Sequence, residues 1–112
     1  MIRSPSWSRL ARSRVDLSLA LAGAVAGSAG DVALLWVAWA ADGRLGLAPA
    51  PPGTFLAGHY LGVLGIPLYV LGYRALADGM ADAPPVAARW VRGLGAIGAI
   101  VGAAIHGLTG ML

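Results

Sequence analysis

The chain has 112 residues, of which 58% are apolar and only 12% are charged. An average soluble domain has about 25% charged residues, so this chain has too few polar side chains to cover a water-soluble fold. It contains no cysteine, lysine or glutamate, which excludes disulfides, thiol catalysis, cysteine-ligated metal centres and a retinal-type Schiff base.

The net charge of +3 comes from eight arginines set against five aspartates. These arginines flank long apolar runs, which is the placement of topology signals and not of a surface that reads bases. We therefore expect no nucleic-acid partner. The composition predicts an all-α integral membrane protein with three transmembrane helices, located in the cell membrane as a multi-pass protein.

Residues 1–14 form a basic segment, and residues 15–112 are expected to form a single transmembrane helical domain. The first predicted span covers residues 17–41 and carries one charged residue, Asp31. At about 1.5 Å per residue, this run is long enough to cross a hydrocarbon core of about 30 Å. Near its end, Trp36 and Trp39 fit the aromatic belt of a membrane interface.

A cleavable signal peptide is the alternative interpretation of this N-terminal region. A basic head, an apolar run and the small residues Gly27 to Gly30 match that pattern. Asp16 opens the apolar run, however, and the sequence stays apolar beyond Gly30. These two features favour a retained membrane span.

The second and third spans follow turn-forming sequences. Residues 42–53 are rich in Pro and Gly and cannot continue a helix. Thr54 is the expected N-cap of a second span over residues 54–76. After a further loop, the third span is predicted at about residues 90–112.

The arginines also predict the orientation, because cytoplasmic loops of membrane proteins are enriched in Lys and Arg. With the N-terminus in the cytoplasm, seven of the eight arginines lie inside: Arg3, Arg9, Arg12, Arg14, Arg74, Arg89 and Arg92. Only Arg44 then lies outside. The sequence therefore predicts a cytoplasmic N-terminus and an outward C-terminus.

Glycines recur at four-residue spacing within the spans, which places them on one face of each helix. Such stripes let membrane helices approach closely. The candidate helix-packing residues are Gly23, Gly27, Gly58, Gly62, Gly98 and Gly102. Through these glycine seams, the protein is expected to form a homo-oligomer or to join a larger membrane complex.

Three ionisable residues lie inside the predicted spans, namely Asp31, His59 and His106. Ionisable groups are costly in a bilayer and are functional candidates by default. Asp31 continues the Gly23 and Gly27 stripe, and His106 continues the Gly98 and Gly102 stripe, so both are expected to point into the bundle.

Their depths can be compared from the predicted outer ends of the spans. The two histidines are expected at about 8–9 Å, and Asp31 at about 15 Å, one to two turns deeper. Pro67 leaves a backbone carbonyl free about one turn from His59, and Tyr60 and Tyr69 could add hydroxyl groups to a polar cavity. The candidate site for a ligand or proton is therefore Asp31, His59, His106, Tyr60 and Tyr69.

Several functions remain open for these residues. An Asp–His site can bind or move a proton, a cation or a small ligand. The two histidines could be axial ligands of a b-type haem, and together with Asp31 they could hold a metal ion. In a structural or accessory subunit, the same residues would only fix helix packing. An enzyme would need an acid–base pair, but no Ser-His-Asp order, phosphate loop or HExxH motif identifies a catalytic residue or a substrate.

A pattern in the first two spans also carries a resemblance. Its elements are Gly30-Asp31, Leu34-Leu35, Gly58-His59-Tyr60-Leu61-Gly62, Gly65-Ile66-Pro67-Leu68-Tyr69 and Gly72. This pattern is similar to that of a family of uncharacterised bacterial polytopic membrane proteins, a domain of unknown function. The resemblance implies longer chains with more spans, of which this chain matches about the first half. It implies a fold and no activity, and it leaves open a half-length form that pairs with another copy.

Overall fold

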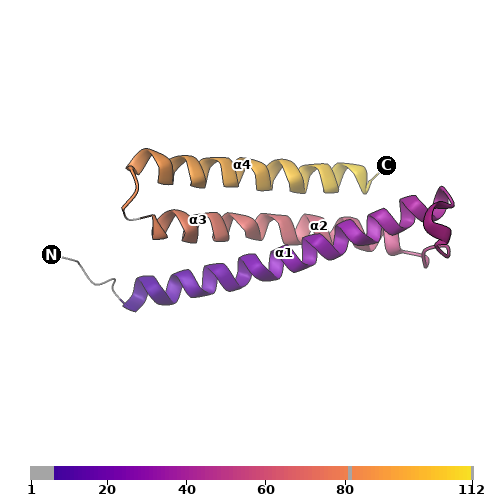
Figure 1. Cartoon of the computed structure of the whole chain (residues 1–112), viewed down its shortest axis with the longest axis horizontal. Coiled ribbons are helices and arrows are strands. Elements are labelled where there is room, and N and C mark those ends of the chain that lie inside the picture. Colours follow the sequence, from indigo (N-terminus) through magenta and orange to yellow (C-terminus); the bar gives the residue numbers. More distant parts are fainter. Residues whose placement is uncertain (1–6, 81, 112) are drawn as a thin grey trace.

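The computed structural model describes residues 7–80 and 82–111, with the side chains from residue 11 onward. Its elements are α1 (Trp7–Ala41), η1 (Arg44–Gly46), α2 (Thr54–Gly65), η2 (Ile66–Leu68), α3 (Tyr69–Gly79) and α4 (Pro85–Thr109). All secondary structure in the described residues is helical. The segments α2, η2 and α3 follow one another along nearly one line and act as a single long rod (Figure 1).

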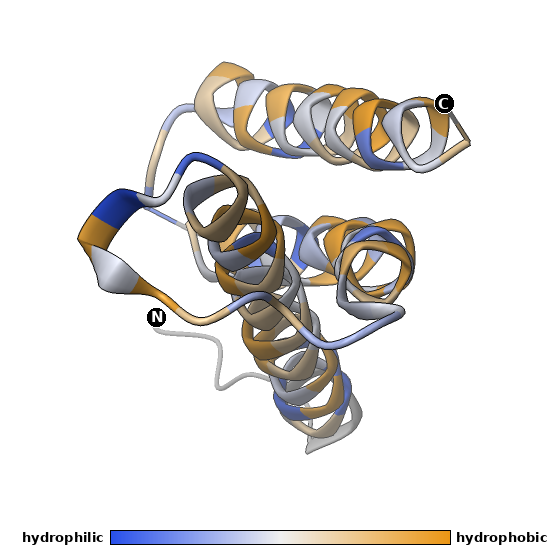
Figure 2. Ribbon diagram, turned by 90° about the vertical axis from the view of Figure 1, so that its right-hand side faces the viewer, coloured by the Kyte–Doolittle hydropathy of each residue, from blue (hydrophilic) through white to orange (hydrophobic). Residues whose placement is uncertain are grey.

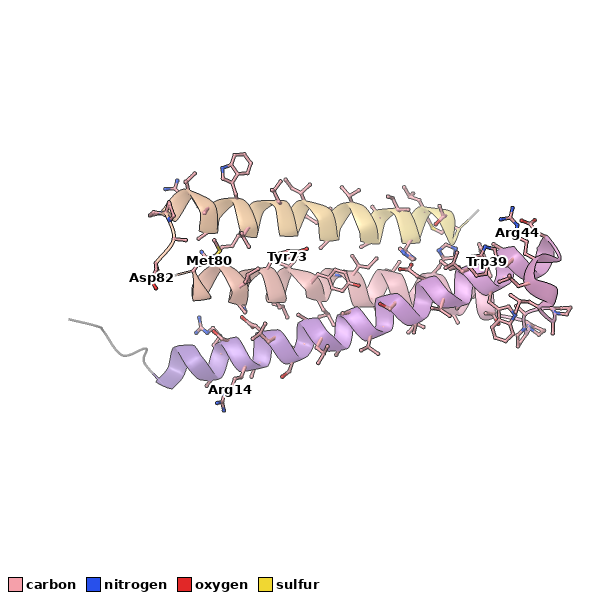
Figure 3. All side chains as sticks on the ribbon, in the orientation of Figure 1. Arg14, Trp39, Arg44, Tyr73, Met80 and Asp82 are labelled. Atoms are coloured by element: carbon pink, nitrogen blue, oxygen red, sulfur yellow. The ribbon has the colours of Figure 1, made fainter. Side chains whose placement is uncertain are left out.

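The molecule is an elongated bundle of 63 × 24 × 23 Å. The rod of α2, η2 and α3 lies between α1 and α4, and both outer helices pack along it (Figure 1). The arginine end is the end that holds Arg14 and the loop from α3 to α4, and the histidine end is the opposite one, where Trp39 and Arg44 lie (Figure 3).

Three segments are long and apolar enough to cross a membrane: Ala11–Ala41, Thr54–Gly79 and Pro85–Thr109. Large apolar side chains point outward on all of them, and Figure 2 shows hydrophobic residues around the circumference of each long helix. The buried apolar residues are small ones, Ala75, Ala77 and Ala99. This distribution suits a bundle with lipid outside and close backbone contacts inside, and it confirms the prediction of three apolar helices.

The predicted end of the first span at residue 41 and the predicted start of the second at residue 54 match the structure, but other boundaries differ. Helix α1 begins at Trp7, so the predicted border between a basic segment and a span at residues 14 and 15 lies inside one continuous helix. Helix α4 begins at Pro85, where a proline at the first helical position sacrifices no hydrogen bond. Leu112 and residues 1–6 lie outside the described residues.

The sequence predicted Thr54 as the N-cap of α2, and this prediction is wrong. Gly53 takes the cap position with φ 84°, a backbone conformation that suits glycine. The Thr54 hydroxyl instead donates a hydrogen bond to the Pro51 carbonyl at 2.7 Å. The prediction failed because the turn from Pro51 to Gly53 shifts the helix start by one residue.

Pro67 interrupts the middle rod without breaking it. A proline has no backbone N–H and crowds the preceding turn, so the chain tightens into a 3-10 turn over Ile66–Leu68. The rod then resumes as α3 and keeps its direction (Figure 1). Pro67 therefore divides the second membrane segment into two helices on one axis.

Helix α1 lies very close to the middle rod at several glycines. A Cβ atom on Gly30 would lie 2.6 Å from the Gly58 carbonyl oxygen, and one on Gly65 would lie 2.7 Å from the Gly23 carbonyl oxygen. Because these neighbours are backbone atoms, they have little freedom to move aside. Side chains larger than hydrogen are therefore excluded where α1 crosses α2.

Candidate functional site

Asp31 and His106 come together near the histidine end. Asp31 Oδ1 of α1 lies 3.3 Å from His106 Nε2 of α4. The His106 side chain is 14% exposed, whereas that of Asp31 is 64% exposed. The pair joins the two outer helices, which otherwise each pack on the middle rod.

A glycine on α2 makes room for the His106 ring. A Cβ atom on Gly62 would overlap the imidazole at Nδ1 and Cγ. His106 Nδ1 is buried in this notch and has no hydrogen-bond partner among the described residues. The ring is therefore held between Asp31 on one side and the Gly62 backbone on the other.

His59 lies beside His106, and it is the more buried of the two at 7% exposure. The two rings meet edge to face with their centroids 5.8 Å apart. On the other side, His59 Nδ1 lies 3.4 Å from the hydroxyl of Thr109. The Phe55 and His59 rings meet edge to face with their centroids 4.5 Å apart. Asp31, His106, His59 and Thr109 thus form a continuous polar row across three helices.

The predicted difference in depth between Asp31 and the histidines is wrong. Asp31 lies ten residues before the end of α1 at Ala41, and His106 lies three residues before the end of α4 at Thr109. However, α1 continues beyond the level at which α4 ends (Figure 1). Asp31 and His106 therefore occupy the same level of the bundle.

Asp31 also borders a cavity of about 340 Å³ between α1, α3 and α4. The cavity is lined by Asp31, Ile66, Tyr69, Tyr73, Leu94, Gly95, Gly98, Ala99 and Gly102. We call this cavity the Asp31 groove. Its walls are aromatic, aliphatic and glycine surfaces, and the carboxylate of Asp31 supplies the charge.

Of the two tyrosines predicted to belong to the site, Tyr69 lies in it and Tyr60 does not. Tyr69 lines the Asp31 groove, and its hydroxyl lies against α1, where a Cβ on Gly27 would be 2.6 Å from it. Tyr60 is 59% exposed on the outer surface of α2, one residue away from the buried His59. Tyr73, which was not among the candidate site residues, lines the groove between α3 and α4 (Figure 3). Its spacing of four residues from Tyr69 was the available signal, because it places both rings on one helix face.

The site residues do not form the predicted metal or haem ligand sets. Within the described part of the chain, no group of three or more His, Cys, Asp or Glu side chains is placed to hold a metal ion. Both ring nitrogens of His106 face protein groups, Asp31 at Nε2 and the Gly62 backbone at Nδ1. Since the two histidine rings also contact each other edge to face, they are not arranged as axial ligands on opposite sides of a haem.

A second polar cluster, which sequence reasoning missed, lies at the arginine end. Arg74 of α3 forms an ion pair with Asp16 of α1, and Arg92 of α4 forms one with Asp78 of α3. Asp16 is 4% exposed. These two pairs connect α1 to α3 and α3 to α4, so the arginines at this end fix helix positions as well as carrying charge.

Comparisons with known proteins identify no relative. No family model matches the sequence, and no curated protein or solved structure matches it significantly. The resemblance to a bacterial membrane protein family therefore stays a prediction, and the function has to be argued from the site itself.

Proposed function

We propose that this protein is a small multi-pass membrane protein whose Asp31–His106 pair takes up and releases a proton. The observation that carries the proposal is the 3.3 Å approach of the Asp31 carboxylate to the His106 imidazole. Histidine changes charge between pH 5 and 8 in its ordinary state, and a nearby carboxylate is its usual proton partner. Ionisable groups inside a membrane helix are rare and tend to mark such sites.

The surroundings of the pair determine where the proton can reside. At Nε2 the imidazole can donate a hydrogen bond to Asp31 or accept one from it. At Nδ1 it faces Gly62 and has no hydrogen-bond partner among the described residues. Uptake of a proton by the pair therefore places an N–H at Nδ1 without an acceptor, which opposes the attraction of the carboxylate for a charged imidazolium.

The groups that face this pair are few. His59 and Thr109 lie beside His106, and Tyr69 and Tyr73 line the groove below Asp31. The charged residues at the arginine end are distant, since Asp16 is fifteen residues from Asp31, about 22 Å along α1. Among the described residues, the titratable groups closest to the pair are therefore His59, Tyr69 and Tyr73.

The experiment is a histidine titration by NMR, which is simple because the chain has two histidines. With the imidazole nitrogens labelled with ¹⁵N, the protein is placed in lipid nanodiscs and titrated across pH 5 to 9. We expect the midpoint of the His106 titration to differ between the wild type and Asp31→Asn. We expect a smaller change for His59. Identical His106 titrations in the two proteins would overturn the proposal.

A flux measurement then separates binding a proton from moving it. Vesicles that contain the protein and an internal pH dye are given an imposed pH difference. Faster decay of the gradient in the wild type than in Asp31→Asn and His106→Ala would extend the function to proton movement. Equal decay in all three would restrict it to proton binding.

The same proposal includes a location and an orientation. The protein resides in the cell membrane, with its arginine end in the cytoplasm and its histidine end outside. The support is the distribution of arginines, because Arg12, Arg14, Arg74, Arg89 and Arg92 all lie toward one end and Arg44 at the other.

A second candidate function is a structural subunit that self-associates, and one observation favours it. A Cβ atom on Gly98 of α4 would meet nothing within 4 Å, whereas one on Gly102 would meet Ile66 at 3.1 Å. Gly98 is therefore free to pack against a second chain, in line with the proposed glycine seams.

Assembly is tested by counting protomers in nanodiscs or by crosslinking in membranes. For the structural function, Gly98→Leu should convert an oligomer to a monomer, and His106→Ala should leave assembly unchanged. The opposite result, with assembly lost only in His106→Ala, would contradict a role for this glycine.

A further inference from the structure

The Asp31 groove combines one carboxylate with two aromatic rings and apolar walls. Asp31 lies at one end, and Tyr69 and Tyr73 form the side of the groove on α3. The opposite wall is the small-residue face of α4 around Gly98 and Ala99. Because glycine has no side chain, this face of α4 leaves space between α1 and α4.

The groove opens on the side of the bundle. Leu94 and Tyr73 are 59% and 42% exposed at its rim. The groove lies among the three segments that are long and apolar enough to cross a membrane, so in a bilayer its open side would face the hydrocarbon. A ligand can thus enter without passing through water.

We propose that the Asp31 groove binds a small lipophilic organic cation, with Asp31 as the counter-ion and the two tyrosine rings against its apolar body. Its volume of about 340 Å³ lies at the lower end of the range of ligand pockets, about 300–1,000 Å³, which suits a compact molecule. The inference rests on the proposed function in one respect, namely that Asp31 is a group whose charge changes with proton uptake.

The sign of the ligand charge follows from the lining residues. A carboxylate repels anions, and the described lining residues contain no cationic side chain to attract them. Aromatic faces attract cations through their negative π surfaces. A neutral apolar molecule would gain nothing from Asp31 and would have to compete with lipid, which fills such a groove equally well.

Asp31 can serve the ligand and His106 in turn. A carboxylate offers about four lone-pair positions, and in this structure one of its oxygens approaches His106. Its side chain is 64% exposed, so the remaining positions are open to the groove. Since a proton on the pair removes the negative charge that attracts the ligand, cation and proton compete for one site. Affinity for the cation should therefore fall as the pH is lowered.

The test uses benzyltrimethylammonium, whose charge does not depend on pH, and its uncharged carbon analogue neopentylbenzene. Binding is measured by ligand-observed NMR with one protomer per nanodisc in phosphatidylcholine, a lipid without net charge. We expect saturable binding of the cation and at least tenfold weaker binding of the neutral analogue. We also expect the affinity for the cation to fall at least threefold from pH 8 to pH 5.5.

Two variants localise the site, and a third is a matched control. Asp31→Asn should weaken cation binding at least tenfold, and Gly98→Leu should do the same by filling the groove. Gly93→Leu makes the same change on the same helix, at a position where a Cβ also meets nothing within 4 Å but which does not line the groove. It should bind the cation as the wild type does.

The outcomes separate this inference from the proposed function. Equal binding of the cation and its neutral analogue, or equal loss in Gly98→Leu and Gly93→Leu, overturns the cation site even if His106 titrates as proposed. Cation binding that depends on Asp31 but not on pH supports the site and contradicts competition with a proton. Failure of the histidine titration alone would overturn the proton-binding function and leave the cation site standing.

Discussion

Arg74 donates two parallel hydrogen bonds to the buried carboxylate of Asp16. Arg74 Nε donates to Asp16 Oδ2 at 2.9 Å, and Arg74 Nη2 donates to Oδ1 at 2.7 Å. Two-point pairing of this kind fixes direction as well as distance. Because Arg92 also pairs with Asp78, the three membrane-crossing segments are tied together at the arginine end, away from the Asp31–His106 pair.

Breaking the Asp16–Arg74 pair should loosen α1 from α3. In Asp16→Asn the guanidinium keeps its charge without a carboxylate partner, and in Arg74→Lys the two-point geometry is lost. We expect a lower melting temperature in detergent for both variants, with a larger drop for Asp16→Asn than for Asp78→Asn in the more exposed pair. The reversed pair, Asp16→Arg with Arg74→Asp, should recover part of the loss. If the reversed pair recovers no stability, the ion pair between residues 16 and 74 is not what stabilises the fold.

The sequence could not reveal this contact. Asp16 stands at the start of an apolar run and Arg74 near the end of another, so both fit the ordinary flanking charges of membrane spans. Pairing them requires the tilt of α1 across the rod, which depends on where glycines allow close approach. The three apolar helices, in contrast, followed from the lengths of the apolar runs, because hydrocarbon thickness sets the length of a span.

Gly62 should be essential for the position of His106. A methyl group at this position would overlap the imidazole, so Gly62→Ala should displace the ring from Asp31 and destabilise the fold by about 1–3 kcal/mol, as overpacking does. The measurement is the His106 ¹⁵N titration together with thermal stability. Gly93→Ala is the control, since its new methyl group meets nothing within 4 Å. A wild-type His106 titration in Gly62→Ala would contradict the conclusion that Gly62 makes room for the His106 ring.

The spacing of residues in the sequence predicted that Asp31 and His106 belong to the site, but it did not predict which polar residues surround them. The four-residue stripes predicted that Asp31 and His106 both point into the bundle. The structure brings the two residues together, but the Asp31 side chain is 64% exposed, so the prediction is wrong for Asp31. Depth counted from predicted helix ends failed because α1 extends past α4 (Figure 1). Tyr60 and Thr109 show the remaining difficulty. Which polar neighbour faces a histidine depends on helix rotation, and a shift of one residue turns a side chain by 100°.

Cysteine labelling should place the arginine end in the cytoplasm. The chain has no cysteine, so a single new one reports without background. Asp42→Cys lies in the loop after α1, and Asp82→Cys lies in the loop before α4. In intact cells, a membrane-impermeant maleimide should label Asp42→Cys at least tenfold faster than Asp82→Cys. The difference should vanish in opened cells, and the reverse preference in intact cells would invert the topology.

Gly30→Leu should disrupt the chain's own fold before it affects any assembly. A Cβ atom there would lie 2.6 Å from the Gly58 carbonyl oxygen, which belongs to the backbone of α2 and has no rotamer to adopt. A leucine must therefore push α1 away from α2, at a cost of at least about 1–3 kcal/mol. Because α1 carries Asp31, the same displacement should also separate Asp31 from His106.

The control for Gly30→Leu is Ala29→Leu, one residue away on the exposed surface of α1. We expect Gly30→Leu to lower the melting temperature of the monomer in nanodiscs and to change the His106 titration, and Ala29→Leu to change neither. If both variants keep wild-type monomer stability and Gly30→Leu loses only oligomers, the glycine contact lies between chains. Gly30 would then allow close contact between two chains, and not between α1 and α2 of one chain. The Asp31–His106 pair, which depends on the position of α1 on α2, would need support from the partner chain.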